Sequence, residues 1–160
     1  MVKKILFVCL GNICRSPAAE GVFKKKIEDR HLENLFIVDS AGTGGWHVGN
    51  LADSRMRETA LSRGIELTSR SRQIEEIDLY EFDHILVMDK DNLHAVQSLV
   101  QNESDPATSK IKLILSYSKN SQLDEVPDPY YGGQHGFEKV LDLLDDAIDG
   151  LLDSLMDFLD

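Results

Sequence analysis

A cysteine and an arginine near the start of the chain define the first site that the sequence suggests. Cys9 and Arg15 are separated by five residues in the stretch 8–20, which reads VCLGNICRSPAAE. Gly11 lets a ligand approach the backbone closely, and Asn12 tolerates a left-handed conformation. The guanidinium of Arg15 is a planar fork of donors that suits two oxygens of a phosphate. These residue types predict a loop that encloses an oxyanion beside a cysteine.

The same surroundings favour a reactive sulfur at Cys9. A loop that leads into a helix N-terminus points backbone N–H groups at an anion, with the positive end of the helix dipole behind them. Helix N-termini and nearby cations also stabilise the thiolate, which is the nucleophilic form of cysteine. Ser16 could donate a hydrogen bond to the sulfur and assist its departure. The arrangement suits attack on phosphorus through a cysteinyl-phosphate intermediate.

Simpler readings of these residues exist. A cysteine that ends a buried strand is usually an inert small hydrophobe, and a Gly-Asn pair is usually a turn. No cluster of His or Cys completes a zinc site around Cys9 and Cys14. The prediction of chemistry therefore depends on the complete Cys-x5-Arg-Ser string lying between a strand and a helix.

Phosphoryl transfer to a thiolate also needs a proton for the leaving oxygen. Asp128 lies between two prolines in VPDPYYGG, and these prolines stiffen the backbone and fix the direction of the carboxyl group. Its loop follows the last predicted strand, so it can return over the sheet. Alone, Pro-Asp-Pro is often a plain turn, but beside the cysteine loop we favour Asp128 as the acid. The other candidate acids are any further carboxyl on a loop above the sheet and the histidines His31, His47, His84, His94 and His135.

The elements that must position these residues alternate between strand and helix. Short apolar runs predict buried strands at 3–9, 35–40, 84–89 and 111–116. Helices are predicted from 16 onward, at 53–63, at 90–100 and from about 137 onward. The first would have Ser16 as its N-cap and Pro17 at its first helical position. The alternation predicts a parallel sheet with helices on both faces and a ligand site at the carboxyl ends of its strands, where Cys9 lies.

Length and charge narrow the class of protein. A chain of 160 residues fits one domain, residues 1–160. The 17 basic and 28 acidic residues give a net charge of −11, which argues against nucleic acid or a membrane surface as partner. The apolar run near the start is too short for a signal peptide and fits a buried strand better. Two cysteines favour a reducing compartment, so we expect a cytoplasmic protein.

Two motifs together carry a family resemblance. VCLGNICRSPAAE and the late DPYYG resemble the low-molecular-weight protein tyrosine phosphatases, and the similarity extends to VDSAGT, RQI and FDHILVMDKDN over nearly the whole chain. The resemblance implies an α/β three-layer sandwich whose four-stranded parallel sheet has the order 2-1-3-4. It also implies a monomeric, metal-independent enzyme without cofactors. Such an enzyme hydrolyses phosphotyrosine in proteins and small aryl phosphates, and releases inorganic phosphate.

The resemblance also implies roles for individual residues. Cys9 matches the nucleophile, Arg15 the residue that binds phosphate and stabilises the transition state, and Asp128 the general acid, which then acts as base for the hydrolytic water. The phosphate-binding loop would comprise Leu10, Gly11, Asn12, Ile13, Cys14 and Ser16. Asn12, Ser16 and Ser40 would form its supporting network. The walls of the substrate cleft would be Leu10, Trp46, Tyr130 and Tyr131.

Two positions of the loop bear on specificity and redox behaviour. Relatives that hydrolyse phosphoarginine resemble this loop but have threonine at the position of Ile13, so isoleucine favours phosphotyrosine. By resemblance, Cys14 is a redox partner that forms a reversible disulfide with Cys9 and protects it from over-oxidation.

Two other functions are alternatives to the phosphatase hypothesis. Arsenate reductases of the same fold begin with the same cysteine loop, but their chemistry needs further cysteines downstream, and none follows Cys14. A silent phosphotyrosine-binding module would have lost its nucleophile or its acid, whereas Cys9, Arg15 and Asp128 are all present.

Overall fold

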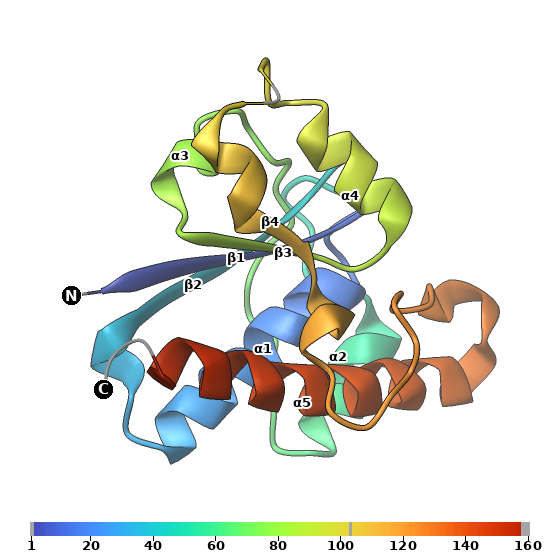
Figure 1. Ribbon diagram of the computed structural model, residues 1–160. Coiled ribbons are helices and arrows are strands. Elements are labelled where there is room, and N and C mark those ends of the chain that lie inside the picture. Colours follow the sequence, from blue (N-terminus) through green and yellow to red (C-terminus); the bar gives the residue numbers. More distant parts are fainter. Residues whose placement is uncertain (1, 103, 158–160) are drawn as a thin grey trace.

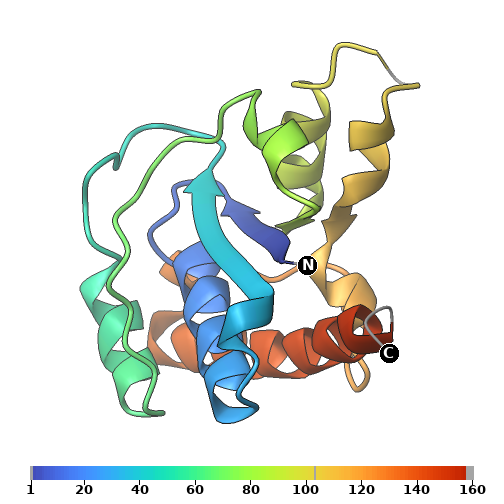
Figure 2. The same ribbon diagram turned by 90° about the vertical axis from the view of Figure 1, so that its left-hand side faces the viewer.

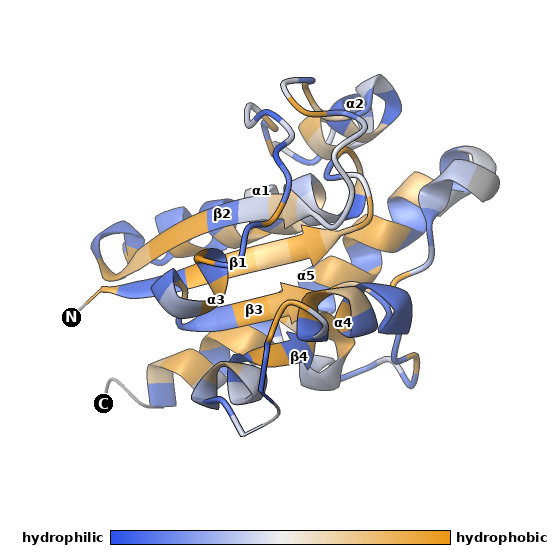
Figure 3. Cartoon of the chain, turned by 90° about the horizontal axis from the view of Figure 1, so that it is seen from above, coloured by the Kyte–Doolittle hydropathy of each residue, from blue (hydrophilic) through white to orange (hydrophobic). Residues whose placement is uncertain are grey.

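Four parallel strands form one sheet at the centre of the protein. The computed structural model describes residues 2–102 and 104–157. The strands are β1 (Lys3–Cys9), β2 (Phe36–Gly42), β3 (His84–Val87) and β4 (Ile111–Leu113), arranged in the order β2-β1-β3-β4. Figure 3 shows the mainly hydrophobic strands, with the arrowheads of β1 and β3 pointing the same way. The predicted α/β class and the strand order 2-1-3-4 are therefore confirmed.

Helices lie on both sides of this sheet. The helices α1 (Arg15–Asp29), α2 (Ser54–Leu61) and α5 (Gly133–Asp157) lie on one side, and α3 (Asp78–Glu81) and α4 (Lys90–Gln97) lie on the other (Figures 1 and 2). Short 3-10 turns cover Glu33–Leu35, Pro106–Lys110, Ile114–Tyr117 and Pro129–Tyr131. Among the described residues, no helix is both long enough and apolar enough to cross a membrane.

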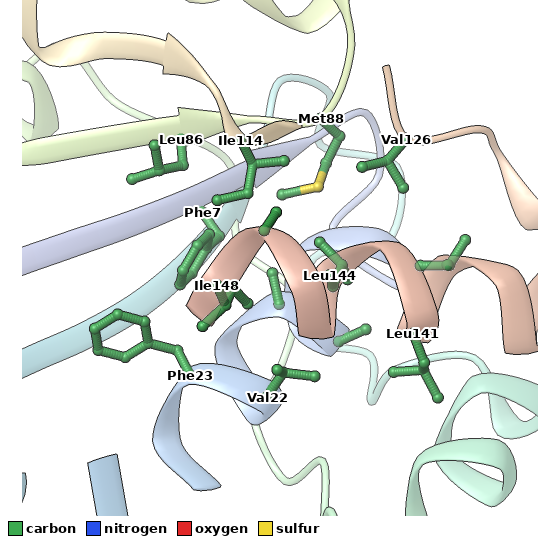
Figure 4. Packing of buried hydrophobic residues seen from close by; sticks show 14 of the residues in the cluster. Phe7, Val22, Phe23, Leu86, Met88, Ile114, Val126, Leu141, Leu144 and Ile148 are labelled. Atoms are coloured by element: carbon green, nitrogen blue, oxygen red, sulfur yellow. The ribbon is translucent and has the colours of Figure 1, made fainter. Parts of the chain in front are cut away.

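Alternation along β1 explains why helices cover both faces. Ile5 and Phe7 belong to the core beneath α1 and α5, whereas Leu6 and Val8 belong to the core beneath α3 and α4. Figure 4 shows the larger core, where Phe7, Phe23 of α1 and Ile148 of α5 gather below the sheet. The sheet is thus held from both sides, and its carboxyl edge is left to carry the site.

Several predicted boundaries differ from the structure. Helix α1 begins at Arg15 with Cys14 at the N-cap and no side-chain capping bond, so the prediction of Ser16 as N-cap is wrong. The hydroxyl of Ser16 is engaged with Cys9 instead. The last strand ends at Leu113 and continues as a 3-10 turn. Helix α4 ends at Gln97 and α5 already begins at Gly133. The short helix α3 was not expected.

Candidate active site

The loop between β1 and α1 is fastened by its carbonyl groups. The carbonyl oxygens of Cys9 and Leu10 accept hydrogen bonds from the amides of Thr43 and Gly44, each at 2.9 Å. The carbonyl of Gly11 accepts from the hydroxyl of Ser71 at 3.0 Å. Within the described residues, the backbone N–H groups of residues 10–14 make no hydrogen bond, so they can donate to an oxyanion. Helix α1 also has no side-chain cap, so the amide of Ser16 at its second position is likewise not occupied by a capping group.

Asn12 fixes the shape of the loop. Its φ of 57° is left-handed, and the residue is buried. Its side-chain amide donates to Ser16 Oγ at 2.7 Å and to Ser40 Oγ at 3.0 Å, while its Oδ1 accepts from the amide of Arg72 at 3.0 Å. Ser40 Oγ donates in turn to Glu20 at 2.6 Å. The structure thus brings together the three residues predicted as a supporting network and adds two partners to them.

This network also sets the direction of the Ser16 hydroxyl. Ser16 Oγ accepts a hydrogen bond from Asn12, so its own hydrogen is free to point elsewhere. The Sγ of Cys9 lies 3.0 Å away, closer than the carbonyl of Ala41 at 3.4 Å. The hydroxyl is therefore placed to donate to the sulfur of Cys9, which is only 3% exposed.

Arg15 is buried and held by one nitrogen of its guanidinium. Its Nη1 donates to Asp89 Oδ2 at 2.6 Å and to the carbonyl of Val126 at 3.1 Å. Burial opposes the charged form, but the negative charge of Cys9 and the bond to Asp89 outweigh it and raise the pKa of Arg15. Within the described residues no hydrogen bond occupies Nε or Nη2, so this edge can grip two oxygens of a phosphate.

Asp89 is a functional residue that sequence reasoning missed. Besides pairing with Arg15, its Oδ1 accepts from the amide of Asn92 at 2.7 Å and caps α4. A signal existed in the sequence: Asp89 follows a buried strand, as the cysteine loop follows β1. The carboxyl ends of parallel strands share one edge of the sheet, so both residues belong to the same edge.

A pocket of about 340 Å³ opens over this loop. Asp128, predicted as the acid, lies in its wall together with the cysteine and the arginine. Trp46 and Tyr130 are 72% and 64% exposed. The side chain of Tyr131 lies outside the described part of the structure. The pocket-lining residues are Cys9, Leu10, Gly11, Ile13, Cys14, Arg15, Trp46, His47, Asp128 and Tyr130.

The second cysteine differs from the first in its electrostatics. Burial raises the pKa of Cys14 to about 12, and the negative charges of Asp53, Cys9 and Asp128 act in the same direction. Cys14 is therefore a neutral thiol near pH 7. Both cysteines are free.

A buried cysteine, a buried arginine and free amides at the edge of a parallel sheet define a phosphatase of the cysteine-dependent class. The family model described as low molecular weight phosphotyrosine protein phosphatase matches residues 4–158. This chain belongs to that family and is a protein-tyrosine-phosphatase.

Relatives and solved structures agree with this assignment. The chain is 49% identical, over 95% of its length and 96% of the relative, to a putative low molecular weight protein-tyrosine-phosphatase of Synechocystis. A protein tyrosine phosphatase structure from Entamoeba histolytica has 45% identity and a TM-score of 0.92, with 97% of each chain covered. A drosophila arginine phosphatase structure is also similar, at 32% identity and a TM-score of 0.87, covering 95% of this chain and 97% of that one.

Proposed function

We propose that Cys9, Arg15 and Asp128 carry out the hydrolysis of phosphotyrosine in two steps. Sγ of Cys9 attacks phosphorus, the P–O bond to the tyrosyl ring breaks, and the carboxyl of Asp128 gives its proton to the leaving oxygen. Asp128 then takes a proton from water, which attacks phosphorus and releases phosphate and the Cys9 thiolate. The observation that carries this proposal is the single pocket lined by all three residues.

Arg15 and the loop amides stabilise the charge that develops on the phosphoryl oxygens. The free edge of the guanidinium and the amides of residues 10–14 are fixed before the substrate arrives, by the bonds to Asp89 and to the loop carbonyls. Preorganised donors in a buried site stabilise a transition state without further reorganisation. Ser16 supports the departure of sulfur in the second step by donating to it.

Pocket depth and the loop side chains support a preference for phosphotyrosine. Cys9 is almost fully buried at the base, whereas Leu10, Trp46 and Tyr130 are exposed at the rim. A phosphate group on an aromatic ring reaches the bottom of such a pocket more easily than a phosphate group on a serine side chain. Ile13 lines the same pocket with an aliphatic side chain and offers no hydroxyl to a phosphoguanidine.

The substrate preference is tested by phosphate release from one peptide carrying phosphotyrosine, phosphoserine or phosphoarginine, with chelator and reductant present. We expect release from the phosphotyrosine peptide, and at least about tenfold less from the other two, because a pocket selects substrates by differential transition-state contacts. Equal release from phosphoarginine would contradict the role given to Ile13. Binding without release from any peptide would favour the phosphotyrosine-binding module.

We also propose that Cys14 protects Cys9 from over-oxidation. Peroxide would convert the Cys9 thiolate to a sulfenic acid, and Cys14 would displace water from it to form the disulfide. Since the pKa of Cys14 is raised to about 12, its thiolate fraction grows about tenfold per pH unit between pH 7 and 9.

Disulfide closure in peroxide-treated protein should therefore accelerate with pH in that range. Mass spectrometry after quenching should show the loss of two hydrogens, and reductant should restore activity. An irreversible gain of oxygen in place of that loss would exclude the disulfide.

The compartment and the assembly state are further proposals. A cysteine-dependent phosphatase needs a reduced nucleophile, and both cysteines are free. We therefore propose that the protein acts in the reducing cytoplasm on phosphotyrosine proteins, and, from the family resemblance, that it does so as a monomer. Sedimentation at several concentrations tests the monomer, and a mass that rises with concentration would contradict it.

A further inference from the structure

The loop that carries Asp128 is anchored ahead of the acid at Val126, which is buried. Val126 donates its amide to the carbonyl of Met88 at 2.8 Å and accepts from Arg15 with its own carbonyl. Asp128 is exposed, and its Oδ1 accepts a hydrogen bond from the amide of Tyr130 at 3.0 Å, which caps the 3-10 turn Pro129–Tyr131. The position of the carboxyl therefore follows the position of Tyr130. Contacts made by Tyr130 thus act on the acid from the C-terminal side of the loop.

A cation from α2 lies against Tyr130. The guanidinium carbon of Arg55 is 5.5 Å from the centroid of the Tyr130 ring and 4.9 Å from that of Phe137. Phe137 is buried at the start of α5, whereas Tyr130 is largely exposed. Arg55 thus connects an exposed ring and a buried ring through cation–π contacts, an interaction that arginine makes often.

Arg55 is itself fixed to the phosphate-binding loop. Its Nε and Nη2 donate to the two oxygens of Asp53 at 3.1 and 2.9 Å, a bidentate pair. The amide of Asp53 donates to the carbonyl of Ile13 at 2.8 Å. One continuous path of contacts therefore runs from the loop around Cys9 to the loop that carries the acid.

We propose that Arg55 is a positioning residue that sets the general acid over the nucleophile. It acts through Tyr130, whose amide holds the Asp128 carboxyl, and through Asp53, whose amide holds the phosphate-binding loop. The inference rests on the proposed role of Asp128. It adds a clamp, by which we mean that Arg55 on α2 fixes the position of the acid relative to the nucleophile. No sequence motif singled out Arg55.

Arg55→Ala tests the clamp by the way its effect depends on the leaving group. We expect kcat/KM for a phosphotyrosine peptide to fall about tenfold or more, since small misplacements of a catalytic group can cost about 100-fold. For p-nitrophenyl phosphate, whose leaving group needs little protonation, we expect less than about a threefold loss. In an Asp128→Ala background, Arg55→Ala should change neither value by more than about twofold.

A matched control separates positioning from general stability. Arg63 lies two residues beyond the end of α2 and forms ion pairs with Glu138 and Asp142 of α5. Arg63→Ala removes contacts between the two segments without touching the acid loop, so its losses should be equal for both substrates.

The outcomes are distinguishable. Equal losses on both substrates for Arg55→Ala, or the same loss in the Asp128→Ala background, overturn the clamp and leave Arg55 a structural residue. If Asp128→Ala itself shows no dependence on the leaving group, the proposed function fails first, and the clamp fails with it.

Discussion

Cys9→Ser should abolish turnover while phosphate binding is retained. A serine hydroxyl at this position is a far weaker nucleophile than a thiolate, and loss of the nucleophile in a serine protease costs about 10⁶-fold in kcat. We expect a loss of at least about 10⁴-fold, measured by phosphate release from a phosphotyrosine peptide. Titration calorimetry with inorganic phosphate should show binding at least as tight as in the wild type, because Arg15 and the loop amides remain and the repelling thiolate is gone.

The matched variant is Cys14→Ser, which makes the same sulfur-to-oxygen replacement at the other cysteine of the loop. Cys14 is a neutral thiol near pH 7 and has no part in the proposed attack. Its replacement should reduce turnover far less than Cys9→Ser does. Turnover near the wild-type rate for Cys9→Ser would refute the thiolate mechanism. Loss of phosphate binding in Cys9→Ser would mean that the loop had collapsed, and the kinetic result would then say nothing of the nucleophile.

The sheet was predictable because local and global signals agree in it. Lys3–Cys9 is a continuous apolar run that ends in the cysteine loop, and the strands and helices alternate as parallel sheets require. The strand order came from the family resemblance. The alternation of residues by itself does not distinguish 2-1-3-4 from other orders.

The start of α1 shows where local rules fail at a functional site. Ser16 followed by proline is a good capping signal, yet the helix begins one residue earlier and leaves its first amides uncapped. The hydroxyl of Ser16 forms hydrogen bonds with Asn12 and Cys9 instead. The amides at the start of the helix therefore stay available to an oxyanion. A conflict between local helix propensity and the observed structure is expected at a functional site, where ligand binding takes precedence over the stability of the helix.

Other parts of the site depend on contacts between segments far apart in sequence. Asp89 reaches Arg15 across 74 positions, and the amide of Arg72 reaches Asn12 across 60. Spacing along the chain carries no information about such pairs. The common sheet edge could have indicated Asp89, whereas the role of Arg55 depends on how α2 packs against α5.

Replacement of Asp128 by asparagine should show the general acid most clearly. Asparagine keeps an oxygen that can accept from the amide of Tyr130, so the 3-10 turn retains its cap, but the amide cannot give up a proton to the leaving group. We expect kcat/KM for a phosphotyrosine peptide to fall about 10²–10⁴-fold, the range typical of a lost general acid. For p-nitrophenyl phosphate the loss should be much smaller.

The second step gives this prediction an independent check. Because kcat/KM reports events up to the first irreversible step, it senses Asp128 as an acid, whereas kcat for an activated ester senses it as the base that helps water attack the intermediate. In Asp128→Asn, kcat for p-nitrophenyl phosphate should therefore fall more than kcat/KM does, and a burst of nitrophenol should precede the steady state.

Asp124→Asn is the control for charge alone. Asp124 lies on the same loop, is exposed and pairs with Lys90. Its neutralisation removes one negative charge from the loop that carries Asp128 without removing a proton donor from the pocket, so both substrates should be affected equally and weakly. Equal losses on the two substrates for Asp128→Asn would remove Asp128 as the acid. His47, the histidine in the pocket lining, would then be the next residue to replace.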